Sequence, residues 1–205
     1  MPKLDLRKEL KHLYQPSAKE VGLVNVPPMS FLMIDGKGDP NQSGSFQQAT
    51  EVLYGVSFTV KFDLKKRGIG PEYAVLPLEG LWWTEGGRDF DMEDNANWLW
   101  TLMIMQPEHI SSDHVAQAVE IYRTKKGGAG LEKIRFEQYE EGLSAQIMHV
   151  GPYSEEGPTI ERIHEFVLEN GYTLYKKHHE IYLSDPRRAK PEKLRTVLRH
   201  PVTQD

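Results

Sequence analysis

The chain has 205 residues, which is enough to bury a hydrophobic core as one large domain or two small ones. Its 25 lysines and arginines against 30 aspartates and glutamates give a formal net charge of −5, which disfavours binding to the phosphate backbone of nucleic acids. It has no cysteine, which excludes disulfides, thiol nucleophiles and thiolate metal sites.

The N-terminal segment is charged throughout and lacks the apolar core of a signal peptide. No uncharged apolar run approaches the ~20 residues that a membrane helix requires. We therefore expect a cytoplasmic protein with neither a nucleic acid nor a membrane as its partner.

The first half of the chain, residues 20 to 107, is predicted to contain two strands, a helix and two more strands. Residues 20 to 36 hold two β-rich runs around a Pro-Pro pair, which is the pattern of a hairpin. After a turn-rich segment, apolar residues recur at helical spacing and predict an amphipathic helix over residues 46 to 63. Residues 73 to 83 and 97 to 107 then have the character of strands, with an acidic loop between them.

The second half, residues 133 to 205, repeats this order. Residues 133 to 151 form two strand-like runs about a turn, residues 155 to 169 have the apolar stripe of a helix, and two further strands follow. Residues 108 to 132 supply a connecting helix and a glycine-rich link. The predicted fold class is therefore α+β, a duplicated ββαββ module with pseudo-two-fold symmetry, with both helices on one side of the sheet.

The segment HHEIYL near the C-terminus places a carboxylate inside a predicted strand. The two-residue period puts His178, Glu180 and Tyr182 on one face, and Ile181 and Leu183 on the other.

Matching the halves by element order aligns HHEIYL with PLEGLWW, so that Glu79 corresponds to Glu180 and both are followed by aromatic residues. A charge buried in such a strand costs stability unless it has a partner. Alternatively, each glutamate faces water or pairs with one of four nearby cations: Lys176, Lys177, Arg187 and Arg188.

Further aromatic residues are candidates for a ligand site. Trp98 and Trp100 share a strand face and either form a flat wall for a planar ligand or fill the core. Tyr54 and Phe58 lie one helical turn apart, off the main apolar stripe, and either cover a cleft or pack at the edge of the core.

No sequence pattern indicates a metal or a cofactor. His178 and His179 are adjacent and so point to opposite sides of a strand, and His109 and His114 have no ligand triad nearby. The acidic DFDMEDN segment lacks the spacing of a calcium loop, the glycine-rich turns lack a phosphate-loop lysine, and no GxSxG elbow is present.

Three segments resemble the GyrI-like small-molecule-binding proteins in their stand-alone form, over essentially the whole chain. These are the opening KLDLRKELKHLYQPSAKEVGLVNVPPMSFLMIDGKGDPN, the central GLWW and the closing HHEIYLSDPRRAKPEKLRTVLRHPV. The resemblance implies two strand-helix-strand-strand (SHS2-type) modules with a ligand cleft between them. Multidrug-sensing activators carry the same domain, but the DNA-binding helices of those activators have no counterpart here, so we do not expect direct transcriptional control.

The resemblance also implies a site and a function. Its cleft glutamate matches Glu180, with Tyr182 beside it, and the implied activity is hydrolysis of the cyclopropane ring of DNA-alkylating toxins, which protects the cell. On this hypothesis Glu180 is the base that activates water and Tyr182 is the hydrogen-bond donor. The alternatives are a non-catalytic module that binds or senses cationic aromatic drugs, and a protein that shields a macromolecular partner. The expected ligand-binding residues are Glu79, Trp82, Trp83, Trp98, Trp100, Tyr54, Phe58 and His178.

Overall fold

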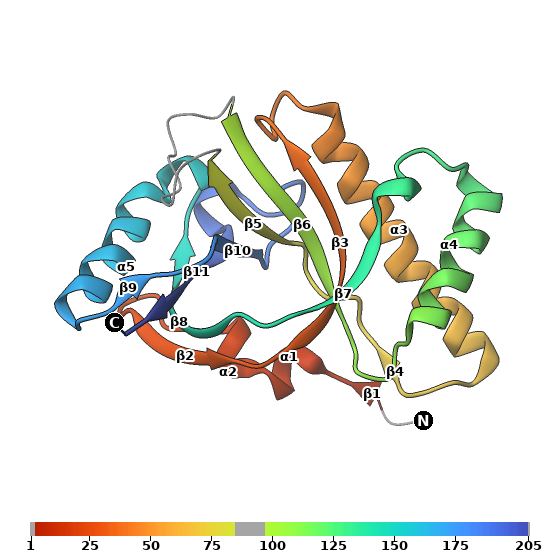
Figure 1. The fold of residues 1–205 in the computed structure, drawn as a ribbon, viewed down its shortest axis with the longest axis horizontal. Coiled ribbons are helices and arrows are strands. Elements are labelled where there is room, and N and C mark those ends of the chain that lie inside the picture. The colour runs from red at the N-terminus through yellow and green to blue at the C-terminus, as the bar shows by residue number, and fades with distance from the viewer. Residues whose placement is uncertain (1–2, 85–96, 205) are drawn as a thin grey trace.

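One curled antiparallel sheet forms the centre of the molecule (Figure 1). The computed structural model describes residues 3–84 and 97–204, so the DFDMEDN segment lies outside the described residues. The sheet order is β2 (Gly22–Val26), β8 (Gly142–Val150), β11 (Arg195–Thr203), β10 (His178–Tyr182), β5 (Glu79–Thr84), β6 (Trp98–Gln106), β3 (Met29–Lys37) and β7 (Arg135–Tyr139). The short β9 (Thr173–Leu174) pairs with β11, and β1 (Lys3–Leu4) pairs with β4 (Glu72–Tyr73) in a separate parallel ladder.

The strand order reads the same from both edges when the two halves of the chain are compared. β10 and β5, which are the third strands of the two halves, pair at the centre of the sheet. Each is followed outward by the fourth and then the second strand of its own half. Each half ends on the first strand of the other half, because β2 pairs with β8 and β7 pairs with β3.

The hairpin predicted for residues 20 to 36 is wrong, although both strands exist. β2 pairs with β8, whereas β3 pairs with β6 and β7. Pro27 and Pro28, which separate the two strands, have no backbone N–H to close a tight two-stranded turn. β3 instead continues the direction of β2, and the two strands face β7 and β8 in one unbroken register, so the two ends of the curled sheet meet at this point.

Two long helices cover the same face of the sheet, as the sequence predicts. α3 (Gly44–Arg67) packs on β3 and β6, and α5 (Gly157–Glu169) packs on β8 and β11, with β10 and β5 between them (Figure 1). α3 ends at Gly68, whose left-handed φ of 69° suits a glycine helix cap. α4 (Ser112–Lys126), the predicted connecting helix, packs against α3.

On the opposite face of the sheet, the short α2 (Lys11–Tyr14) buries Leu13 and Tyr14, and α1 (Leu6–Glu9) precedes it in the chain. Within the described residues, no helix has the length and apolar character that crossing a membrane requires.

The Trp100 side chain packs directly over Gly36 of β3. Gly36 lies opposite Trp100 in the β3–β6 ladder, and a Cβ at this position would overlap atoms of the Trp100 ring. Trp100 is fully buried and its indole N–H donates to the carbonyl oxygen of Gly38 over 3.2 Å, so the ring is fixed in the core.

We expect Gly36→Ala to lower the free energy of unfolding by about 1–3 kcal/mol, because the Trp100 ring must move out of a well-packed position. Gly22→Ala on β2 is the control, since a Cβ there meets nothing within 4 Å. Urea unfolding of both variants measures the difference, and equal stability of the two would contradict this account of the packing.

Candidate functional site

The carboxylate of Glu180 lies in a hydrogen-bonded cluster on the face that α3 and α5 cover. The Tyr182 hydroxyl donates to Glu180 Oε2 over 2.7 Å, and the Trp82 indole N–H donates to the Tyr182 hydroxyl over 3.0 Å. His178 Nε2 lies 3.3 Å from Glu180 Oε1. Glu180 is 7% exposed. The structure thus joins His178, Glu180 and Tyr182 on one strand face, as the two-residue period predicts.

Gly80 on the neighbouring strand makes this arrangement possible. It pairs directly with Glu180, and a Cβ at Gly80 would lie 2.7 Å from the Trp82 indole nitrogen and 3.1 Å from the Tyr182 hydroxyl. Only a residue without a side chain leaves room for the Trp82 and Tyr182 side chains to meet over this position.

Aromatic rings surround the Glu180 carboxylate. Trp82 stacks on Phe46 of α3 with ring centroids 6.0 Å apart, and it meets the edge of Trp98 at 5.5 Å. Tyr153, in the turn before α5, meets the edge of Tyr182 at 5.7 Å. The rings therefore enclose a charged group in an environment of low polarity, which suits a flat aromatic ligand.

The two predicted helix residues lie on one side of this cluster. The Tyr54 hydroxyl accepts a hydrogen bond from the backbone N–H of Leu78 over 3.1 Å, at the start of the strand that carries Trp82. Phe58 stacks on Tyr54 and on Phe62, and Phe58 and Phe62 are 42% and 57% exposed. A row of rings thus runs along α3 from the Glu180 side of the sheet to the solvent.

A second buried carboxyl, Glu156, lies near Glu180 and was missed by the sequence analysis. It occupies the N-cap position of α5, it is 2% exposed, and its Oε1 has no hydrogen-bond partner among the described residues. Burial and the negative charge of Glu180 raise the pKa of Glu156 to about 9. The only sequence signal was a glutamate before a helix, and a carboxylate there usually points to solvent and caps the helix.

Glu79 and Trp83 lie on the opposite face of the sheet, away from Glu180. Strand pairing sets Glu180 against Gly80 and Glu79 against Ile181, so the alignment of Glu79 with Glu180 is wrong by one residue. A shift of one residue in a strand moves a side chain to the other face. Trp83 accordingly packs under the Lys177 ammonium, whose Nζ lies 3.2 Å from the ring centroid.

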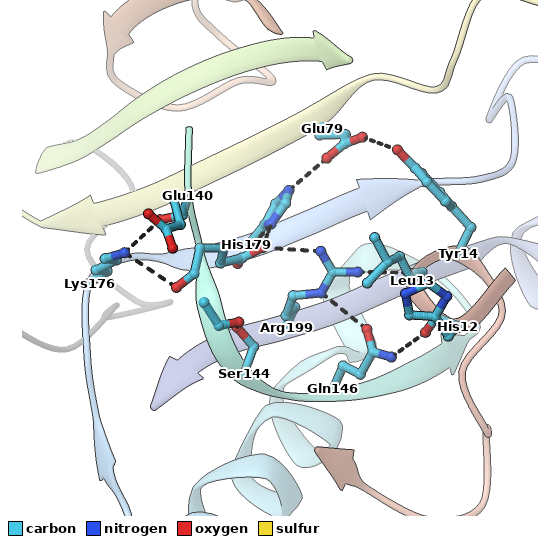
Figure 2. A network of polar contacts seen from close by, with 12 residues as sticks. His12, Leu13, Tyr14, Glu79, Glu140, Ser144, Gln146, Lys176, His179 and Arg199 are labelled. Atoms are coloured by element: carbon cyan, nitrogen blue, oxygen red, sulfur yellow. Dashed lines mark hydrogen bonds and ion pairs between the residues drawn. The ribbon is translucent and has the colours of Figure 1, made fainter. Parts of the chain in front are cut away.

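Glu79 belongs instead to a buried charged network behind the central strands (Figure 2). Its carboxylate accepts from the Tyr14 hydroxyl over 3.0 Å and lies 3.0 Å from His179 Nε2. His179 Nδ1 lies 2.9 Å from the Glu141 carboxylate, which also binds Arg199 over 3.1 Å. Both imidazole nitrogens thus face carboxylates, which favours the doubly protonated cation.

The same network attaches the N-terminal segment to the sheet (Figure 2). Arg199 donates to the backbone oxygen of Leu13 over 2.7 Å and to Gln146 over 3.1 Å. Gln146 in turn donates to the backbone oxygen of His12 over 2.7 Å. Helix α2 is therefore held on the back of β8 and β11, and its Tyr14 reaches Glu79 on β5.

In this network the pKa of Glu141 is lowered and that of His179 is raised, although burial disfavours the charged form of both groups. Burial alone would raise the pKa of Glu141, but His179 and Arg199 lower it to about 2. Burial alone would lower the pKa of His179, but Glu141 and Glu79 raise it to about 9. Two carboxylates and two cations therefore coexist in the interior.

Histidines also cluster on the Glu180 face. The rings of His178 and His164 lie 5.9 and 6.0 Å from His200, whose pKa burial and these neighbours lower to about 3. Within residues 3–84 and 97–204, no three histidine, aspartate or glutamate side chains are placed to hold a metal ion.

The chain matches a known family of small-molecule-binding domains. Residues 19–203 match the GyrI-like small molecule binding domain, and the chain belongs to this family. A comparison with curated proteins finds no match.

Several solved structures are similar over the whole chain. A conserved protein from Listeria innocua is 40% identical with a TM-score of 0.90, covering 98% of this chain and 100% of its own. Two hydrolases from Listeria innocua are 38% and 40% identical, with TM-scores of 0.85 and 0.87 and the same coverage. The C-terminal domain of EcmrR, at 12% identity and a TM-score of 0.55, covers 91% of this chain and 98% of its own, and shares the fold.

We expect Glu141→Gln to lower the free energy of unfolding by about 3–5 kcal/mol, because it leaves Arg199 and His179 buried without their shared carboxylate. The stabilisation from Glu141 is present above its ordinary pKa of 4.5 and is lost as the pH falls toward 2. That from His179 is present below 6.5 and is lost as the pH rises through about 9.

The deficit of the variant should therefore be largest between pH 4.5 and 6.5. Chemical denaturation across this range measures it, with the exposed neighbour Glu140→Gln as the control. A Glu141→Gln protein as stable as that control would show that the network adds nothing to stability.

Proposed function

We propose that this protein binds hydrophobic, aromatic small molecules against the Glu180 face, in a cleft between α3 and α5, and adds water to a strained cyclopropane ring of the ligand. The observation that carries the proposal is the buried Glu180 carboxylate, hydrogen-bonded to Tyr182 and enclosed by tryptophan and tyrosine rings. Family membership supports the binding of a small molecule, and the similarity to two hydrolases from Listeria innocua supports hydrolysis.

The residues suit the proposed reaction. The Glu180 carboxylate takes a proton from water, and the water oxygen forms a bond to a ring carbon while the strained carbon–carbon bond breaks. The released electron pair moves through the conjugated ligand to a carbonyl oxygen, which becomes a phenol by taking up one proton. Once Glu180 has taken the proton of water, the Tyr182 hydroxyl is free to turn from Glu180 to this oxygen, where its hydrogen bond stabilises the developing charge. The sum is the addition of one water molecule, and relief of ring strain supplies much of the driving force.

The aromatic set suits the binding step. Tyr153, Tyr182 and Trp98 are half-buried, so their rings are in reach of a ligand that enters from solvent. Trp100 belongs to the supporting core, since it is fully buried. Opening the cyclopropane ring of an alkylating toxin removes its electrophile, and the protein would protect the cell in this way from within the cytoplasm.

A second candidate function is binding without reaction. A buried carboxylate among aromatic rings also suits an organic cation, with ring faces contributing about 0.5–2 kcal/mol each by cation–π contact. Turnover of a cyclopropane substrate separates the two functions, because only the first requires water to attack.

We also propose that the fold arose by duplication of an SHS2-type module. The strand order supports this, and so do the matching strand lengths: β2 and β7 have five residues each, and β3 and β8 have nine each. A two-fold axis through the Gly80–Glu180 pair would make Glu180 equivalent to Gly80 and Tyr182 equivalent to Trp82. The two halves would then share one reactive centre.

We expect Glu180→Gln to lower the rate of ring opening by roughly 10²- to 10⁴-fold, because the amide keeps the shape of the side chain but cannot accept a proton from water. Tyr182→Phe should have a smaller effect, since it removes a donor but keeps the ring. The assay follows the addition of water to a cyclopropane-bearing alkylating compound by mass spectrometry.

Glu79→Gln is the matched control. Glu79 is next to Gly80, which pairs with Glu180, but its carboxylate lies on the other face of the sheet. This substitution should lower the melting temperature and leave turnover per folded molecule unchanged. A Glu180→Gln protein with native stability and native turnover would remove Glu180 from the site.

A further inference from the structure

Unsatisfied polar atoms gather beside Glu180. Glu156 Oε1, Thr196 Oγ1 and both ring nitrogens of His200 are buried without a hydrogen-bond partner among the described residues. Thr196 pairs directly with Tyr182, and the His200 ring lies 5.9 Å from that of His178, so these atoms face the Glu180 side of the sheet. Buried polar groups are nearly always satisfied, and exceptions are concentrated where a protein binds or reacts.

We propose that Glu156 is a second catalytic carboxyl of this site, a neutral acid that donates a hydrogen bond to an oxygen of the ligand and passes its proton to that oxygen when the ring opens. The inference rests on the proposed function, and it names the group that supplies the proton.

The position of Glu156 suits this role. It follows Tyr153–Glu155, the turn whose Tyr153 ring meets Tyr182, and it starts α5. The charges of Glu156 and Glu180 both act on Tyr182 and Tyr153, where they add to burial in raising the pKa of each phenol. Both carboxyls therefore act on the same two phenols, whose rings meet edge to face.

The surroundings decide which carboxyl keeps a proton. Glu180 accepts the Tyr182 O–H and lies within hydrogen-bond distance of His178, so both of its oxygens have partners. Glu156 acts electrostatically on Tyr182 of β10 and on Tyr153 before α5, and its own neighbours are Glu180 of β10 and Thr196 of β11. None of these four side chains is a cation.

Burial and the Glu180 charge raise the pKa of Glu156 to about 9 against the lowering effect of the Thr196 hydroxyl, so Glu156 is protonated at neutral pH. A protonated carboxyl beside a second carboxyl is a usual arrangement of an acid and a base.

The proton balance of the step is closed. Glu180 gains the proton of the attacking water, and Glu156 loses its proton to the oxygen that receives the electron pair of the broken bond. The product is the hydrated, ring-opened phenol. Transfer of the proton from Glu180 to Glu156, directly or through the Tyr182 hydroxyl, then restores the starting state.

The first test is the pH profile of turnover. Wild-type activity should fall as the pH rises through about 9, because the acid becomes ionised. Glu156→Gln keeps an N–H donor but has no proton to transfer, so its turnover should fall by roughly 10²-fold or more and its alkaline limb should disappear. The exposed neighbour Glu155→Gln is the control and should keep the wild-type profile. Native turnover with an unchanged alkaline limb in Glu156→Gln would overturn the proposal.

The second test does not depend on turnover. Infrared difference spectra between pH 7 and pH 10 should show loss of the carbonyl band of a protonated carboxyl in the wild type, and no such loss in Glu156→Gln. Affinity of the wild type for an unreactive aromatic ketone should weaken over the same pH range, while that of the variant should not.

These outcomes separate the two proposals. Absence of wild-type turnover, with the band and the pH-dependent affinity present, contradicts hydrolysis and leaves Glu156 as the neutral donor. Absence of the band in the wild type overturns the assignment of Glu156 whatever the turnover is.

Discussion

The ionic contact between His179 and Glu141 fixes the strand on which the candidate site is built. His179 occupies the back of β10, where its two ring nitrogens lie against the carboxylates of Glu141 and Glu79. The next residue, Glu180, projects from the front of the same strand. Because neighbouring side chains alternate between faces, any slip of β10 that moved Glu180 would also break the buried ion pairs behind it. The charged layer on one face therefore sets the register of the reactive layer on the other.

The free-energy cost of burying these charges explains why the N-terminal segment packs against the back of the sheet. A buried cluster of two carboxylates and two cations is tolerated only if each donor and acceptor is paired. The strands cannot supply all of these partners, so the N-terminal segment contributes the Tyr14 hydroxyl and the backbone oxygens of His12 and Leu13 (Figure 2). Helix α2 is thus part of the support of β10, although it lies on the face opposite Glu180.

Local patterns predicted most of the fold and the core of the candidate site. Alternation along HHEIYL was enough to place His178, Glu180 and Tyr182 together, and helical periodicity located α3 and α5 to within four residues at each end. The pairing of strands was not predictable in this way. β2 pairs with β8 of the second half and not with β3, which follows it in sequence. Pairing between the two halves also sets Glu180 opposite Gly80, so that Glu79 and Glu180 lie on different faces of the sheet.

Glu156 was missed for a related reason. Its burial results from α5 closing onto β11, which nothing in the PYSEEGPT segment specifies.

Partners, more than depth of burial, decide the chemical state of each buried carboxyl in this protein. Glu141 and Glu156 are both almost completely buried, at 3% and 2% exposure. Glu141 has His179 and Arg199 as donors, and its pKa falls to about 2. Glu156 has another carboxylate as its main charged neighbour, and its pKa rises to about 9. Desolvation penalises both anions, and only the first is compensated. The back of β10 therefore keeps its charges at neutral pH and is structural. The front holds a carboxyl whose proton can leave, and a transferable proton beside a second carboxyl is what acid–base chemistry on a bound ligand requires.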